Sequence, residues 1–214
     1  MSAGRSGEPL RPGAIEVVPA TADRWDDVVT IMAGPAGGAD DGDERGCWCQ
    51  APRGRVPGGR AAAPGARPAA LRAQLAEDPP AGLLAYVDGE VAGWLGFGPR
   101  PMLPRLERSR TIPRLDDLPV WAILCFKIRV GYRRRGVASA LLAALVAYAR
   151  EQGAPGLEAY PIDAGGRRLD VSFSFVGLVS MFEKAGFEAV AATTARSAGR
   201  ERIVMRRMFG PTAT

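Results

Sequence analysis

The segment 120–162 has the sequence VWAILCFKIRVGYRRRGVASALLAALVAYAREQGAPGLEAYPI, and this part of the chain decides the fold. Residues 121–130 are an apolar, partly β-branched run, too short to span a membrane and typical of a buried strand. A helix is predicted next, ending at Gln152-Gly153 before an extended pattern over residues 157–162. One side of this helix is apolar and consists of Val137, Leu141, Leu145 and Tyr148. The segment therefore predicts a strand, a turn, a helix and a second strand in direct succession.

The turn before the helix combines positive charge with small residues. Arg133, Arg134 and Arg135 run directly into Gly136, and Ala138 follows in the first helical turn. Backbone N–H groups at a helix start lack intrahelical partners, and the helix dipole adds partial positive charge there. A phosphate fits such a turn, because small residues let its oxygens approach the main chain. The turn is neither a P-loop nor a Gly-x-Gly-x-x-Gly loop, since neither pattern is present.

The hexapeptide Arg133-x-x-Gly136-x-Ala138 resembles the Arg/Gln-x-x-Gly-x-Gly/Ala signature of the GCN5-related N-acetyltransferases (GNAT), in which it holds the pyrophosphate of acetyl-coenzyme A. A distal segment, Phe182-Glu183-Lys184-Ala185-Gly186-Phe187, matches the family as well. The resemblance covers about residues 15–208 and implies an α/β fold: one domain with a mixed, mostly antiparallel central sheet flanked by helices. Residues 80–100 and 158–163 are further similar to uncharacterised, actinobacterial-type members that also carry Cys-Trp-Cys. The alternative is a basic helix N-terminus on an ordinary α/β domain.

The resemblance implies that acetyl-coenzyme A is a co-substrate and that the acetyl group passes directly to a primary amine. Main chain at Ile128, Arg129 and Val130 would bind the pantetheine, and an N–H between Phe126 and Ile128 would polarise the thioester carbonyl. Loop amides of residues 134–139 would hold the pyrophosphate. The coenzyme-binding residues implied in this way are Phe126, Lys127, Ile128, Arg129, Val130, Arg133, Arg134, Arg135, Gly136, Val137, Ala138, Ser139, Phe182 and Lys184.

Two positions depart from the family pattern for catalysis. The tyrosine that in many members protonates the leaving thiolate is replaced by Phe182, which has no proton to donate. The glutamate that many members carry early in the central strand is missing, and Ala122 stands near that place. The catalytic candidates are therefore Asp117, Glu158 and Tyr160, and the candidates for contact with the acceptor are Trp48, Tyr86 and Cys125. Solvated carboxylates outside the site are the alternative explanation for the acidic residues.

Cys47-Trp48-Cys49 lies in a segment rich in Gly, Pro and Arg, residues 34–67, which is predicted to be a mobile surface loop. The motif leaves three interpretations open: the start of a zinc site, a hydrophobic anchor with Trp48 buried, or a wall of the acceptor pocket. Zinc is the least favoured, because only Cys125 could add a third thiolate. Cys125 is expected on the same strand face as Ile123 and Lys127, as a packed and inert thiol.

Composition narrows the class of protein. The 214 residues are 47% hydrophobic, enough for one core, and carry a net charge of +5. This charge suits a phosphate-rich ligand, and no helix-turn-helix pattern or basic aromatic platform favours nucleic acid. The absence of histidine excludes Ser/His/Asp and Cys/His nucleophilic sites and His-based metal centres, so no metal is expected. Three cysteines suggest no disulfide framework, and with a polar N-terminus we expect a soluble, cytoplasmic protein.

The rest of the chain predicts one α/β domain over residues 14–209, with tails at 1–13 and 210–214. A strand at 15–18 precedes a helix that Thr21 would cap. The inner face of this helix would carry Trp25, Val28, Val29 and Met32. The other expected elements are a helix at 69–76 with Leu71 and Leu75 inward, strands at 82–87 and 91–97 around an Asp88-Gly89 turn, an arginine-rich loop at 99–119, a helix at 177–184, and strands at 189–195 and 202–209.

Three functions are open on these grounds. The first is acetyl transfer to a small-molecule amine, the second is acetylation of protein lysines or N-termini, and the third is a non-catalytic acyl-coenzyme A sensor. The arginines of residues 99–119 favour an acidic acceptor over a polycationic one. The expected partners are acetyl-coenzyme A and an amine, without a membrane, and a homodimer is compatible with the sequence.

Overall fold

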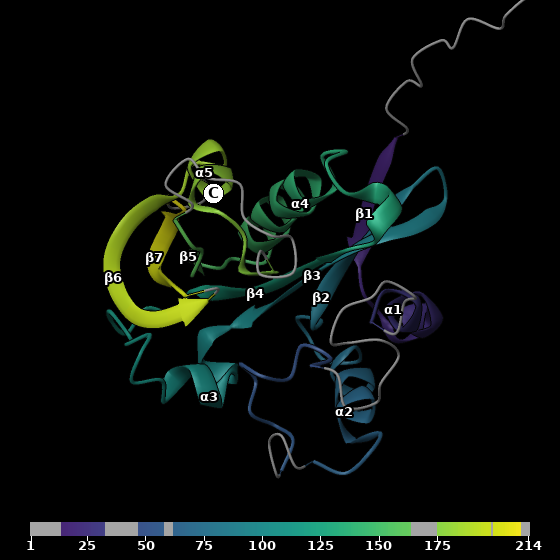
Figure 1. The fold of residues 1–214 in the computed structure, drawn as a ribbon, viewed down its shortest axis with the longest axis horizontal. Helices are drawn as coiled ribbons and strands as arrows, with labels where there is room; N and C mark the ends of the chain where they lie inside the picture. Colours follow the sequence, from purple (N-terminus) through teal and green to yellow (C-terminus); the bar gives the residue numbers. More distant parts are fainter. Residues whose placement is uncertain (1–13, 33–46, 58–61, 164–174, 198, 211–214) are drawn as a thin grey trace, which may run out of the picture.

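The computed structural model describes residues 14–32, 47–57, 62–163, 175–197 and 199–210 (Figure 1). Its strands are β1 (Ile15–Pro19), β2 (Gly82–Val87), β3 (Glu90–Pro99), β4 (Trp121–Ile128), β5 (Gly156–Ala159), β6 (Glu188–Ser197) and β7 (Arg200–Met208). They form one seven-stranded sheet in the order β1-β2-β3-β4-β5-β7-β6. Only β4 and β5 pair in parallel among these neighbours. The predicted fold class, a single α/β domain with a mixed and mostly antiparallel sheet, is confirmed.

Helices cover both faces of this sheet. They are α1 (Trp25–Met32), α2 (Ala66–Gln74), α3 (Pro104–Glu107), α4 (Val137–Glu151) and α5 (Val179–Lys184), with short 3-10 turns η1 (Ala22–Arg24), η3 (Arg100–Met102) and η4 (Val130–Tyr132). In Figure 1, α4 and α5 lie on one face, whereas α1, α2 and α3 lie on the other. No helix within the described ranges is long and apolar enough to cross a membrane.

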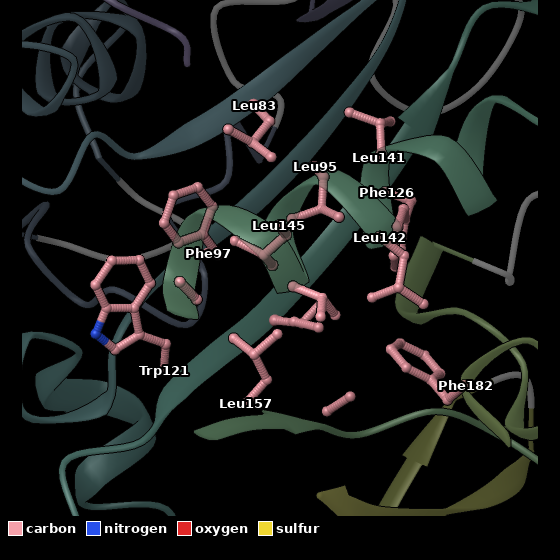
Figure 2. Close-up of a cluster of buried hydrophobic side chains, with 14 of the residues drawn as sticks. Leu83, Leu95, Phe97, Trp121, Phe126, Leu141, Leu142, Leu145, Leu157 and Phe182 are labelled. Carbon is pink, nitrogen blue, oxygen red and sulfur yellow. The ribbon is translucent and has the colours of Figure 1, made fainter. Parts of the chain in front are cut away.

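Each face of the sheet has its own hydrophobic core. Leu141 and Leu145 of α4 belong to the cluster that contains Phe97 of β3, and Figure 2 shows these side chains. On the opposite face, Val28 of α1 and Leu71 of α2 belong to a second cluster. The central strand β4 contributes side chains to both clusters, which explains why its sequence is continuously apolar rather than alternating.

A bulge interrupts β4 at its centre. Cys125 pairs with Gly96 of β3 and Ile123 pairs with Phe97, so Leu124 is an extra residue. Leu124 and Cys125 both pack with the cluster on the α1 face, whereas Ile123 packs on the α4 face. The prediction that Cys125 shares a face with Ile123 is therefore wrong, because the bulge breaks the two-residue period of the strand.

The parallel pairing of β4 with β5 is very short. It joins Trp121 to Leu157 and Ala122 to Glu158, and no further pair between the two strands is present in the described residues. β5 ends at Ala159 rather than at the predicted residue 162, and Ile162 forms only isolated bridges. Beyond Ala122, β4 therefore has no β5 partner among the described residues, and this unpaired side of residues 124–128 is called the gap between β4 and β5 below.

Most predicted elements are confirmed with shifted bounds. The clearest correction concerns residues 99–119, predicted as an arginine-rich loop, which contain η3, α3 and the buried Arg100. α2 begins at Ala66, inside the predicted loop 34–67, and Thr21 precedes a 3-10 turn without a capping hydrogen bond from its side chain. The structure does not describe residues 34–46 and 58–61 of that predicted loop, the predicted tail at 1–13, or residues 211–214 of the predicted tail at 210–214; residues 33, 164–174 and 198 also lie outside the described ranges.

Candidate active site

The turn between η4 and α4 has the backbone shape of an anion-binding loop. Arg134 and Gly136 have positive φ angles of 61° and 83°, and Gly136 occupies the N-cap position of α4. Gly136 makes no side-chain capping hydrogen bond, so the first N–H groups of α4 lack that partner. A Cβ on Gly136 would meet only Ile15 Cδ1, at 4.0 Å. The glycine is therefore required by its backbone angle and not by lack of space.

Arginines surround this loop. The guanidinium carbons of Arg129 and Arg135 lie 5.5 and 5.7 Å from the ring centre of Tyr132. Arg129 Nη1 donates to the Val91 carbonyl at 2.6 Å, and Arg133 Nε donates to the Ile128 carbonyl at 3.2 Å. These arginines make no salt bridge to a carboxylate of the described chain. The loop thus has a fixed shape and a positive field, as a pyrophosphate site requires.

The other predicted coenzyme-binding residues divide into two groups. Lys127 lies near the end of β4, where its Nζ donates to the Met32 carbonyl at 2.7 Å, and Val137, Ala138 and Ser139 form the first turn of α4. Phe182 is instead fully buried on the α4 face, with its ring centre 6.2 Å from that of Phe126 (Figure 2). Lys184 is exposed on α5. The structure brings the β4 and loop residues together, but it places Phe182 in the core and Lys184 on the surface.

Glu158 lies at the centre of a buried ionic network. Its Oε1 accepts hydrogen bonds from Arg100 Nη1 and from the Tyr160 hydroxyl, both at 2.6 Å, and its Oε2 accepts one from Arg206 Nε at 2.6 Å. Burial, and then the negative charge of Glu158, raise the pKa of Tyr160 well above its ordinary value. Both carboxylate oxygens are engaged, an arrangement typical of a structural anion. Nothing in the sequence marked Arg100 and Arg206 as partners of Glu158, because arginine side chains are normally solvated.

The acidic residues before β4 lie away from the loop. Asp117 is fully exposed and its Oδ1 lies 3.2 Å from Arg114 Nη2. The neighbouring Asp116 pairs with Arg206, which lowers the pKa of the Asp116 carboxyl. Both residues precede the start of β4, whereas the anion-binding loop follows its end.

Trp48 and Tyr86 both contact the first helical segment. The Trp48 ring stacks on Trp25 of α1 with the ring centres 5.9 Å apart, and Trp48 is 7% exposed. This packing supports the interpretation of Cys-Trp-Cys as a hydrophobic anchor. The Tyr86 hydroxyl donates to Asp27 Oδ2 at 2.6 Å and accepts from Arg24 Nη1 at 3.3 Å.

Cys49 and Cys125 form a pair of thiols whose sulfurs lie 3.2 Å apart. The hydrogen bond from Cys125, with added help from the charge of Arg53, lowers the pKa of Cys49 to about 6. The same hydrogen bond, together with burial, raises the pKa of Cys125 well above its usual value. We infer that the pair shares one proton at neutral pH. It joins the Cys-Trp-Cys turn to the bulge of β4, a contact that the sequence alone did not reveal.

Gly96 of β3 makes room for this thiol pair, and Gly96→Ala is expected to lower the free energy of unfolding by about 1–3 kcal/mol. The added Cβ would lie 2.3 Å from Cys49 Sγ and 3.0 Å from Trp94 Nε1. Urea denaturation measures the loss. Gly98→Ala is the control on the same strand, because its Cβ would make only ordinary contacts, at 3.6 Å or more. Adding Cys49→Ala to Gly96→Ala should restore part of the loss; an unchanged stability of Gly96→Ala would contradict the close contact.

Diamide, which takes two electrons and two protons from a thiol pair, is expected to join Cys49 and Cys125 in a disulfide. Because the pKa of Cys49 is about 6, the rate should level off above that pH instead of rising steeply through the range of an ordinary thiol. Mass mapping of alkylated peptides identifies the bond. Cys47→Ser should react like the wild type, whereas Cys125→Ser should lose the cross-link. A bond to Cys47 instead would overturn the assignment.

A pocket of about 440 Å³ opens on the face of the sheet that carries α3. Its lining includes Leu124 of β4, Tyr160 just beyond β5 and Arg202 of β7. Leu124 lies on β4 and Tyr160 directly follows β5, so the pocket adjoins the gap between β4 and β5. The pocket lining includes neither Trp48 nor Tyr86, although Ala51 and Pro52, just after Cys-Trp-Cys, belong to it.

A glycine-led helix N-terminus, two parallel strands that pair over only two residues and a separate pocket point together to an acyltransferase with a mixed sheet. The model of the Acetyltransferase (GNAT) family matches residues 56–187, more than half of the chain. The chain therefore belongs to the GNAT family and is an acyltransferase by that membership. No curated protein sequence matches it at a significant level.

Solved structures with the same fold cover nearly the whole chain. A GNAT-family acetyltransferase from Streptococcus pneumoniae is 14% identical, with a TM-score of 0.54, over 92% of this chain and 100% of that one. A GCN5-related N-acetyltransferase from Kribbella flavida is 16% identical, with a TM-score of 0.53, over 92% and 98%. A ribosomal-protein-alanine N-acetyltransferase from Brucella melitensis is 18% identical, with a TM-score of 0.51, over 91% and 99%. At such identities the likeness concerns the fold.

Proposed function

We propose that this protein is an acetyl-coenzyme A-dependent N-acetyltransferase that transfers the acetyl group directly to a primary amine of a small molecule. The observation that carries the proposal is the junction of two features. One is the uncapped, glycine-led N-terminus of α4, and the other is the gap that opens where β4 leaves β5. The first suits a pyrophosphate, and the second leaves room for an extended thioester arm beside backbone groups.

The residues present fit acetyl-coenzyme A, which supplies an activated acetyl thioester when bound. Loop N–H groups of residues 134–139 would hold the pyrophosphate, within the field of Arg133, Arg134 and Arg135. Main chain at residues 128–130 would bind the pantetheine. An N–H between Phe126 and Ile128, beyond the bulge of β4, would stabilise the negative charge that develops on the carbonyl oxygen.

The rate would come mainly from proximity, because the catalytic candidates are already engaged. Tyr160 lines the pocket, and its raised pKa keeps its hydroxyl protonated while it donates to Glu158. Glu158 would position Tyr160 and Arg100 rather than accept the proton of the amine. Asp117 is exposed and would have no role in the reaction. The proton of the acceptor amine would therefore leave through water.

A thermal-shift titration with acetyl-coenzyme A tests the proposal, followed by thiol release against a panel of amines. A ligand at about 100 times its dissociation constant stabilises the folded state by about 2.7 kcal/mol, which gives a clear rise in melting temperature. Desulfo-coenzyme A should also bind but release no thiol. A folded protein whose melting temperature does not change with acetyl-coenzyme A would overturn the coenzyme assignment.

A non-catalytic acyl-coenzyme A sensor is the second candidate, favoured by the buried Phe182 and the engaged Glu158. Coenzyme binding without thiol release on any amine would decide for it. Acetylation of protein lysines or N-termini would instead show as competition by basic or N-terminal peptides. The assignment to the actinobacterial-type group with Cys-Trp-Cys, and a cytoplasmic location, are further proposals. The close, unbridged thiols of Cys49 and Cys125 support a reducing compartment.

A further inference from the structure

The pocket of about 440 Å³ has a strongly one-sided charge. Arg105 and Arg108 of the α3 region and Arg202 of β7 line it, and no carboxylate belongs to the described part of its lining. None of these three guanidinium groups makes a salt bridge to a described residue. Elsewhere arginines do find acids: Arg100 pairs with Glu158 and Glu107, and Arg206 pairs with Glu158 and Asp116. Positive charge thus gathers in the pocket without a counter-ion from the described residues.

Arg202 is the best placed of the three to bind a ligand. Its Nε donates to the Tyr160 carbonyl at 2.7 Å, and its guanidinium carbon lies 5.7 Å from the centre of the Tyr160 ring. These contacts fix the side chain and leave its two terminal nitrogens unengaged by the described residues. Burial lowers the pKa of Arg202 to about 10, and Tyr160 offsets only part of this effect. A desolvated cation of this kind is stabilised by an anion that pairs with it.

Arg206, four residues along β7, shows what such a pairing looks like. Arg206 is 9% exposed. It donates a hydrogen bond through Nε, as Arg202 does, and it forms ion pairs with Glu158 and Asp116. Arg202 has the same kind of anchoring but pairs with no acid among the described residues. A bidentate carboxylate is the group that a guanidinium fork matches best.

Apart from Ser109 and Tyr160, the remainder of the pocket lining is apolar. Leu124, Ile112 and Val176 are buried residues of its lining. An acceptor bound there must carry an apolar carbon skeleton as well as a negatively charged group. Its amine must reach the gap beside Leu124. A polycationic acceptor is disfavoured by the same three arginines.

We propose that the acceptor is a small amino acid-like molecule, in which a carboxylate bound by Arg202 and an apolar carbon skeleton accompany the amine that receives the acetyl group. Arg105 and Arg108, both exposed, attract the carboxylate, and Arg202 binds it. This inference rests on the proposed acetyltransferase function and names its substrate class.

The test compares acids with their carboxamides as acceptors in thiol release. The panel contains phenylalanine, leucine, methionine and 6-aminohexanoate, each beside its amide. A charge-assisted pair contributes about 1.5–3 kcal/mol, so the acids that fit should be preferred by about 10- to 100-fold in kcat/KM. For the α-amino acids this preference would oppose the intrinsic reactivity of the amines, because the amine of the amide is less protonated than the amine of the acid.

Arg202→Gln should lower kcat/KM for the preferred acid by at least about tenfold, mainly through KM, and should leave the amide unchanged. The thermal shift by acetyl-coenzyme A should stay as in the wild type, which shows that the variant is folded. Arg196→Gln is the matched control: Arg196 is an exposed arginine that pairs with Glu201 on the same β6-β7 hairpin, and its loss should leave turnover of the acid unchanged. The exposed pair Arg105→Gln/Arg108→Gln should weaken acid turnover in a salt-dependent way.

The outcomes distinguish a failure of the proposed function from a failure of the carboxylate inference. Absence of coenzyme binding and of thiol release would overturn the proposed function itself. Two outcomes would overturn the carboxylate inference alone, provided that the coenzyme binds. In one, amides or amidated peptides are acetylated at the same rate as the acids; in the other, no acid is acetylated. Equal loss for acid and amide in Arg202→Gln would also overturn it, because a structural role predicts that result.

Discussion

Glu158→Gln is expected to lower the free energy of unfolding by about 3 kcal/mol, because it leaves two buried guanidinium groups short of a counter-ion. Glu158 is fully buried, Arg100 is 2% exposed and Arg206 is 9% exposed. The expected loss lies at the lower end of the range for broken buried pairs, since Arg100 keeps Glu107 and Arg206 keeps Asp116. In a domain of this size the melting temperature should fall by roughly 6–12 °C. Equilibrium urea denaturation measures the free energy directly.

Glu201→Gln is the matched control for this change. Glu201 also pairs with an arginine, Arg196, but the two side chains are 65% and 62% exposed. Because such surface pairs contribute about 0–1 kcal/mol, the control should be nearly neutral. If both variants lost the same small amount, the buried network would not be the stabilising element described above. A large fall in thiol release at unchanged stability would instead make Glu158 a catalytic residue.

Gly136→Ala is expected to weaken acetyl-coenzyme A binding by about tenfold. A residue with a Cβ costs about 1–2 kcal/mol at the φ of 83° found here, although the space around Gly136 is open. The free protein can relax the turn, but binding would force it back, so the cost appears in the dissociation constant. Isothermal titration with the coenzyme measures it.

Gly153→Ala provides the control at the other end of α4. Gly153 has a φ of 73° and, like Gly136, open space around its missing side chain. The same backbone strain should therefore reduce stability without any change in coenzyme affinity. Equal affinities for Gly136→Ala and the wild type would remove the loop from the binding site, and equal weakening in both variants would point to a general effect on α4.

Local patterns were sufficient for much of the fold. The apolar run of β4, the helical spacing of Val137, Leu141 and Leu145, and the Asp88-Gly89 turn each depend on neighbours within a few residues, so the sequence displays them directly. The loop of Gly136 belongs to the same group, because the glycine and the helix that follows it are adjacent in the chain. Its positive φ is the physical reason for a glycine at that position.

Contacts between residues far apart in the sequence could not be predicted from local patterns. Arg100, Glu158 and Arg206 meet in space from three separate strands or turns, and nothing local distinguishes them from solvated residues. The thiol pair of Cys49 and Cys125 depends on a bulge that moves Cys125 to the other face of β4, which an alternating pattern cannot predict.

The sequence by itself determined the order of the elements, the family resemblance and the place of the anion-binding loop, because these features arise from residues close together in the chain. Only the tertiary structure decided which charges are buried together, which arginines pair with no acid among the described residues, and where the pocket opens. The physical reason is that burial and ion pairing depend on sheet order and on the separation of β4 from β5. These are set by packing across the whole domain rather than by any single segment.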